Sequence, residues 1–270
     1  MGRRAILCPK CRRIVGSEET SCSWCGTSRS NPLWHLVQTV QGPSWAQGIC
    51  WGIIAINLLF YLLALLLSAK LDFNGALHLA PGRNSLFMLG ATGTFPIDRY
   101  GRIWSLITAN YLHGGLLHLL FNMMALRQLA VWVAVEYGTS RMIILYTGGG
   151  IAGYLMSYVA GVPFTIGASA AVCSLIGALL YYGKSRGGAY GTSVYREVGG
   201  WAVGLFLFGF IVPGINNWAH GGGMLGGILL GMVLGYQEKR ADHPADQLMA
   251  VACTAITLLA LGWALFGARL

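Results

Sequence analysis

The chain has 270 residues, of which 55% are hydrophobic and only 10% are charged. A soluble domain carries about 25% charged residues, so this composition excludes an ordinary soluble domain and indicates a membrane protein. The net charge of +9 does not favour a nucleic-acid partner, because much of the excess lies in the first 30 residues and in short loops between apolar runs. Basic loops in these places are typical of membrane topology.

The amino-terminal segment, residues 1–30, contains two C-x2-C pairs, which are formed by Cys8, Cys11, Cys22 and Cys25. Four thiolates at this spacing can close a tetrahedral zinc site. The metal would supply the folding energy that so small and polar a segment cannot gain from a core. A redox pair and disulfides are the alternatives, and disulfides are disfavoured in a reducing cytosol. We predict a small zinc ribbon with structural zinc.

A linker over residues 31–44 leads to a series of long apolar runs. A helix of about 20 apolar residues crosses a bilayer with its backbone polar groups satisfied, so we predict an all-α membrane protein. Seven spans are expected near 48–69, 113–135, 141–161, 168–183, 198–212, 218–236 and 247–267. The first six form a core over 45–236, and residues 237–270 add a loop and the seventh span. The interrupted segment before the second span is expected to dip only partly into the membrane.

The basic residues indicate the orientation of these spans. If the amino terminus lies inside, that side carries Arg3, Arg4, Lys10, Arg12, Arg13, Arg29, Arg141, Lys184, Arg186, Arg196, Lys239 and Arg240. The other side carries only Lys70, Arg83, Arg99, Arg102 and Arg269, and Arg127 falls inside the second span. The positive-inside rule therefore predicts a cytoplasmic amino terminus. An uncleaved cytosolic end without a targeting sequence suits a prokaryotic plasma membrane.

Polar side chains gather at one depth of the predicted spans. The second, fourth and sixth spans run in the same direction, and their first turns hold His113, His118 and Asn122, then Ser169, then His220. Polar residues inside a span are costly and indicate a functional site. Faces of small residues on the fourth and sixth spans end in Ser169 and His220, so these two helices can approach closely.

A serine next to a histidine can act as a nucleophile. An imidazole takes the hydroxyl proton and returns it to the leaving amine, so Ser169 and His220 fit the roles of nucleophile and base. The backbone N–H of Ser169, His118 and the Asn122 amide are candidate oxyanion donors. Taken singly, a membrane serine is a packing residue, a histidine is an interfacial side chain, and Asn122 is a helix–helix hydrogen bond. Their convergence favours catalysis.

Three motifs resemble those of the rhomboid family. Residues 111–122 resemble its H-x4-H-x3-N motif, residues 167–170 resemble its G-x-S-G, and residues 219–227 resemble its A-H-x2-G-x3-G. The motifs follow the family's order on the expected spans, and the resemblance covers roughly residues 45 to 236. The extra span resembles the six-plus-one arrangement of this family.

This resemblance implies a rhomboid-like six-helix bundle and an intramembrane serine endopeptidase that cleaves transmembrane segments of other membrane proteins in the bilayer. It assigns Ser169 as nucleophile, His220 as base, His118 and Asn122 as oxyanion donors, and His113 and Gly167 as supporting residues. No cofactor is implied for catalysis. Substrate helices are expected to enter laterally beside the fifth span. For the zinc ribbon, a protein partner is favoured over nucleic acid.

The chain departs from the family pattern at three positions. Ala170 replaces the second glycine of G-x-S-G, Ser105 stands where many members have arginine after tryptophan, and Cys173 stands where an aromatic residue often backs the histidine. None of these changes removes a proposed reacting group.

Two other functions remain open. An inactive rhomboid-like protein that binds transmembrane helices would usually have lost the serine or the histidine, and both are present. A transporter would use carboxylates inside its spans to couple ions, and none falls inside the predicted ones. Hydrolysis also needs water, so a wet cavity is expected, lined by Thr108, Asn110, Asn216 and Asn217.

Overall fold

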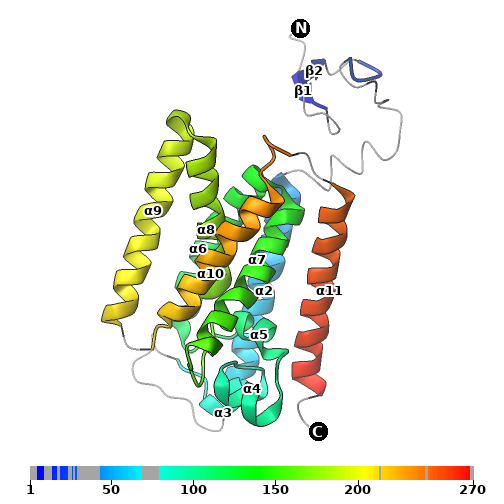
Figure 1. The fold of residues 1–270 in the computed structure, drawn as a ribbon. Helices are drawn as coiled ribbons and strands as arrows, with labels where there is room; N and C mark the ends of the chain where they lie inside the picture. Colours follow the sequence, from blue (N-terminus) through cyan, green and yellow to red (C-terminus); the bar gives the residue numbers. More distant parts are fainter. Residues whose placement is uncertain are drawn as a thin grey trace.

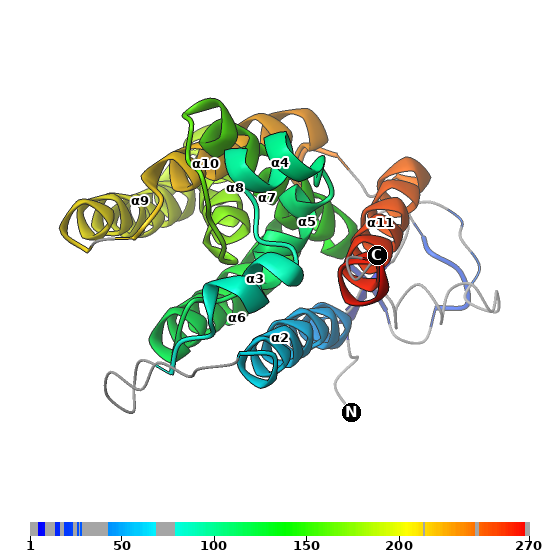
Figure 2. The same ribbon diagram turned by 90° about the horizontal axis from the view of Figure 1, so that it is seen from below.

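The computed structural model describes residues 5–8, 14–16, 19–23, 26, 28, 43–68, 79–212, 214–240 and 243–267. Most of these residues form a bundle of long helices (Figures 1 and 2). The long helices are α2 Pro43–Leu66, α6 Leu116–Tyr137, α7 Thr139–Val159, α8 Ser169–Arg186, α9 Gly188–Ile211, α10 Asn217–Leu234 and α11 Pro244–Phe266. Between α2 and α6 lie the short helices α3 Arg83–Met88, α4 Thr94–Tyr100, α5 Ser105–Thr108 and η1 Ala109–Tyr111.

Five of the long helices, α2, α6, α7, α9 and α11, are long and apolar enough to cross a membrane. Together they support an integral, multi-pass, all-α membrane protein. The helices α8 and α10 have 18 residues each and are not among these five. In α8, 12 of the 18 residues are buried within the protein. Only a small part of this helix can face lipid, so its sequence does not need to be apolar throughout. The count of seven spans stays a prediction.

The prediction for the fifth span begins ten residues too late, since α9 starts at Gly188 and not near residue 198. Gly187 and Gly188 both have positive φ, 67° and 65°, so the chain turns sharply and α9 follows α8 without a loop. Polar residues between 189 and 197 interrupt the apolar pattern, so the first turns of this helix could not be predicted from hydrophobicity.

Three carboxylates that lie just outside the predicted spans are part of the long helices. Glu136, Glu197 and Asp246 lie within α6, α9 and α11, because these helices extend beyond their apolar segments. Glu136 accepts a hydrogen bond from the Tyr190 hydroxyl, and Asp246 pairs with a buried arginine. Both of these carboxylates are held in contacts near helix ends.

A buried ion pair attaches α11 to the rest of the bundle. Arg141, near the start of α7, is fully buried, and its Nη2 lies 2.8 Å from Oδ2 of Asp246. The guanidinium also donates to the carbonyl oxygens of Gly235 and Arg240. A buried charge without its partner would be strongly destabilising, so this contact fixes where α11 begins. The helix then packs along α7 and against α5.

At the centre of the bundle, glycines allow α7, α8 and α10 to pack backbone against backbone. A Cβ atom built on Gly223 of α10 would overlap the carbonyl oxygen of Ala170, and one built on Gly227 would overlap that of Ser174. Both contacts step by four residues along α8 and α10, so the two helices run parallel in a fixed register. Small residues serve this purpose in membrane helices.

We predict that Gly227→Ala destabilises the protein. The added methyl group meets the Ser174 carbonyl in the α8–α10 contact, and overpacking of this kind costs about 1–3 kcal/mol. The measurement is thermal unfolding in detergent, with Gly204→Ala as the matched control, since a Cβ on Gly204 of α9 meets nothing within 4 Å. Equal melting temperatures for both variants would mean that α8 and α10 are not in this close contact.

Candidate active site

The serine, both oxyanion candidates and the base lie near the start of three helices. Ser169 is the first residue of α8, His118 is the third of α6, and His220 is the fourth of α10. Asn122 follows one turn after His118. Ser169 and His118 are partly exposed, whereas Asn122 and His220 are buried, with 7% and 3% of their surface exposed.

Gly167 lies beside both His118 and the serine. A Cβ atom built on it would be 2.8 Å from Nε2 of His118 and 3.5 Å from Oγ of Ser169. The φ of Gly167 is +129°, a conformation that side chains rarely adopt. Only glycine therefore fits this position, both in conformation and in space. The structure brings the His118 ring and the Ser169 hydroxyl together around the place where a side chain of residue 167 would lie.

Two hydrogen bonds hold Gly167 in place. Its N–H donates to the carbonyl oxygen of Ala109 at 2.9 Å, and its own carbonyl accepts from the Tyr154 hydroxyl. Two residues before Gly167, Thr165 forms an isolated antiparallel bridge with Thr92. The segment before Ser169 is thus tied both to the segment before α6 and to α7.

The hydrogen bonds of His118 indicate its tautomer. The Gly114 N–H donates to Nδ1 of His118 at 3.4 Å, so a neutral ring carries its proton on Nε2, the nitrogen beside Gly167. That N–H is a donor directed at the site. The Asn122 side-chain amide donates to the His118 carbonyl at 2.8 Å, and one of its two N–H groups remains for another acceptor.

The position of His220 follows from the packing of α8 and α10. Ala170 contacts Gly223. Ser169 lies one residue before Ala170 and His220 lies three residues before Gly223, so both are within about one helical turn of this contact. Within the described parts of the chain, no hydrogen bond joins Ser169 Oγ to His220, and Nδ1 of His220 is buried without a partner. The dyad that the sequence predicts is thus brought to one end of the bundle without a formed hydrogen bond.

His113 lies outside the helix in which the sequence placed it, because α6 begins at Leu116. It is fully buried, and its ring centroid lies 5.0 Å from that of His118. Neither of its ring nitrogens has a hydrogen-bond partner among the described residues. The His113 ring therefore packs against the His118 ring in an edge-to-face contact.

The departures from the family pattern are accommodated by neighbouring residues. The Cβ of Ala170 lies 2.9 Å from where a Cβ of Gly153 would be, so its methyl group points toward α7 and not toward Gly167. Ser105 is buried and donates to Oγ1 of Thr92, and Cys173 is fully buried.

Two of the four residues that were expected to line a wet cavity do not face water. Thr108 and Asn110 are 0% and 3% exposed, and both side chains donate to backbone carbonyls. Asn216 caps α10 by accepting from the Ala219 N–H, and its amide donates to Ser157 and Thr165. These residues position the active-site segments.

No motif or spacing singles out Tyr154. It lies in a helix whose other polar residues carry no motif, and only its hydrogen bond to Gly167 shows its position beside the serine segment. Gly153 was also missed, since its role depends on how closely the Ala219 carbonyl of α10 and the methyl group of Ala170 approach α7.

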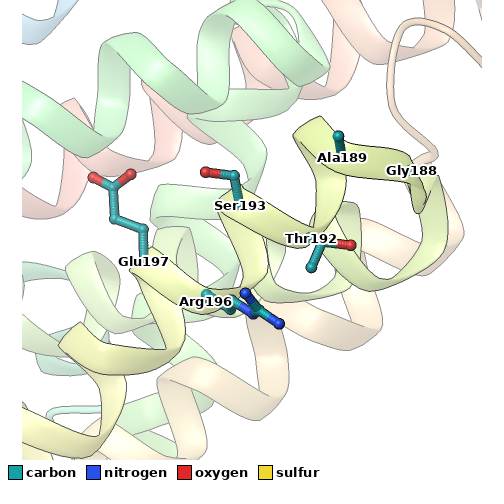
Figure 3. Close-up of a pocket in the computed structure, with 6 residues that line it drawn as sticks. All are labelled: Gly188, Ala189, Thr192, Ser193, Arg196 and Glu197. Atoms are coloured by element: carbon teal, nitrogen blue, oxygen red, sulfur yellow. The ribbon is translucent and has the colours of Figure 1, made fainter.

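A surface hollow at the start of α9 does not coincide with this site. It is lined by Gly188, Ala189, Thr192, Ser193, Arg196 and Glu197 (Figure 3). Because α8 runs from Ser169 to Arg186 at about 1.5 Å per residue, the hollow lies roughly 25 Å from the serine. It can play no part in chemistry at Ser169.

Two of the four predicted zinc ligands fall within the described residues. Cys8 and Cys22 are both buried, with 0% and 2% of their surface exposed. Cys11 and Cys25 lie outside the described residues. Strand β1 (Ala5–Leu7) pairs antiparallel with β2 (Ile14–Gly16) around the first cysteine pair, and a Ser21–Ser28 bridge flanks the second.

Comparison with known proteins agrees with the motifs. Residues 100–237 match the Rhomboid domain, which is just over half of the chain. The chain is 32% identical to Rhomboid protease GluP of Bacillus subtilis (strain 168) over 187 residues, which are 68% of this chain and 35% of that protein. It is 32% identical to RHOMBOID-like protein 4 of Arabidopsis thaliana over 158 residues, which are 58% of this chain and 40% of that protein.

A shorter relative is covered more fully. The putative rhomboid protease YdcA of Bacillus subtilis (strain 168) is 33% identical over 143 residues, which are 52% of this chain and 71% of that protein. The chain thus spans less than half of the first two relatives and most of the third. The domain match and these identities lead to one conclusion about descent: this chain belongs to the rhomboid family.

Proposed function

We propose that this chain is an intramembrane serine endopeptidase that cleaves transmembrane segments of other membrane proteins with Ser169 and His220. The observation that carries the proposal is that the Ser169 hydroxyl and Nε2 of His118 both lie within 3.5 Å of the place where a Cβ of Gly167 would be. This closeness supports a site in which the nucleophile and an oxyanion donor act on the same carbonyl group. Two relatives, one named a rhomboid protease and one a putative rhomboid protease, support the same class of reaction.

The reaction follows from these positions. His220 takes the Ser169 proton while Oγ attacks the peptide carbonyl carbon, and the carbonyl oxygen becomes an oxyanion. The Nε2–H of His118 and the Ser169 N–H donate to it, with Asn122 beside them. His220 then gives its proton to the leaving amine, which breaks the peptide bond. Water hydrolyses the acyl-serine by the same steps and restores the hydroxyl.

Access of a substrate helix is proposed to be lateral, beside α9. The buried residues of α9, Gly191 to Ala202, lie in its first two thirds, where it packs against α8. Toward its other end, Val203, Leu207 and Phe210 are exposed by 61%, 58% and 78%. Figure 2 shows α9 at the edge of the bundle, next to α8 and α10. In a membrane, exposed apolar side chains of this kind can pack against another helix.

The dyad is tested with a fluorophosphonate probe on the protein purified in detergent. We expect Ser169→Ala to abolish labelling and His220→Ala to slow it by at least about 100-fold, because a general base contributes this much. Ser185→Ala, at the opposite end of the same helix, should label as the wild type does.

One observation favours an alternative, an inactive protein that binds transmembrane helices: Nδ1 of His220 is buried without a hydrogen-bond partner among the described residues. A folded wild type that does not label, and that retains a transmembrane peptide without cutting it, would replace the protease proposal by this one.

The Gly167→Ala variant tests the oxyanion geometry separately from the dyad. Its methyl group would displace the His118 ring, so we expect kcat to fall by about 100- to 1000-fold with little change in KM. Gly161→Ala is the matched control, because Gly161 also has a positive φ, 78°, but faces open space. Equal losses in both variants would mean that backbone strain, and not the His118 contact, lowers activity.

For the amino-terminal segment we propose a zinc ribbon that favours a protein partner in the cytoplasm. Burial of Cys8 and Cys22 in a segment with only short paired strands supports a metal as its source of stability. Metal analysis of the purified chain should give about one zinc ion per chain, and less than half of this in Cys8→Ser. Cys253→Ser, in α11, should keep the full content. A zinc-free wild type produced in zinc-containing medium would refute the ribbon.

A further inference from the structure

Arg127 is an exposed cation in the middle of a spanning helix. It is the twelfth of the 22 residues of α6, and its side chain is exposed. The Cys50 thiol of α2 donates to the Leu126 carbonyl, so this part of α6 lies directly against α2. The proposed chemistry at Ser169 makes no use of Arg127. A charge in a span is costly and indicates a partner.

The described part of the protein offers no carboxylate to this arginine. Its acidic side chains are engaged elsewhere: Glu19 with Gly16, Asp98 with Tyr158, Glu136 with Tyr190, Glu238 with Arg186, and Asp246 with Arg141 and Arg240. Glu197 lies beside Arg196 in the hollow on α9 (Figure 3). A partner for Arg127 must therefore come from outside these residues.

The arginine lines a hollow between α2 and α6 that is rich in hydrogen-bond donors. The lining residues are Gln47, Cys50, Trp51, Arg127, Gln128 and Val131. The guanidinium carbon lies 5.7 Å from the centroid of the Trp51 ring, which is itself 56% exposed. A guanidinium with two side-chain amides suits the oxygens of a phosphate group, and the indole and valine suit an acyl chain.

The depth of the hollow also suits a lipid. Arg127 lies ten residues before the end of α6 at Tyr137, or about 15 Å, and Gln47 lies one turn inside α2. Tyr137 lies at the end of the bundle that carries Arg141, and this end is predicted to be cytoplasmic. A long arginine side chain reaches toward that interface, and tryptophan is typical there. Basic hollows between helices on the cytoplasmic side are where anionic head groups bind.

We propose that the α2–α6 hollow binds the phosphodiester head group of an anionic phospholipid, with Arg127 as the charged contact. Gln47 and Gln128 donate to the phosphate oxygens, and Trp51 packs along the lipid. Because the head group contacts both helices, it holds α2 against α6, the helix that carries His118 and Asn122. The binding itself does not depend on protease activity.

The test is native mass spectrometry of the full chain in detergent, with phosphatidylglycerol or phosphatidylcholine of identical acyl chains. We expect the wild type to retain phosphatidylglycerol about tenfold better, which corresponds to about 1.4 kcal/mol. Arg127→Gln should lose this preference, and Arg127→Lys should keep part of it. The matched control is Arg196→Gln, since Arg196 is an exposed arginine of the hollow on α9 and should not affect retention (Figure 3).

Several outcomes would overturn the proposal. These are equal retention of the two lipids by the wild type, an unchanged preference in Arg127→Gln, or the same loss in Arg196→Gln. Inorganic phosphate that displaces the lipid at millimolar concentration would identify a soluble anion as the ligand instead. If Arg127→Gln does not fold, Gln47→Leu removes a donor from the α2 side and should reduce the same preference severalfold.

Discussion

The close contact between α8 and α10 is the constraint on which the rest of the structure depends. Gly223 and Gly227 bring the α10 backbone against the carbonyl groups of Ala170 and Ser174. A side chain at either glycine would overlap these carbonyl groups, and this register places Ser169 and His220 at the same end of the bundle. In lipid, where apolar surfaces gain little from one another, such packing is itself a source of stability.

A second layer of polar contacts surrounds this core and fixes its ends. At one end, the carbonyl of Ala109 and the hydroxyl of Tyr154 hold the glycine before the serine. At the other, Arg141 and Asp246 fix the start of α11. The two kinds of contact differ in their purpose: the hydrogen bonds at Gly167 shape a reactive site, and the ion pair places a helix that lies outside the domain match.

The sequence was sufficient to predict the helical membrane class, the approximate positions of the helices and the residues that gather at one end. These features depend on apolar runs and on short motifs, which are local. The start of α9 and the position of His113 could not be predicted, because turns and polar first turns carry no apolar signal. Thr108 and Asn110 were misjudged for a different reason: whether a polar side chain meets water or a backbone carbonyl depends on tertiary neighbours.

The meeting of Ala170 and Gly153 has a consequence for how such proteins vary. A Cβ atom on Gly153 would lie 2.6 Å from the carbonyl oxygen of Ala219 and 2.9 Å from the Cβ of Ala170, so α10 and α8 both close this place to a side chain. A glycine at position 170 would remove only the second of these contacts. The glycine of α7 is therefore expected to persist during evolution whichever small residue follows the serine, and the residue after the serine is expected to vary between glycine and alanine without a compensating change in α7.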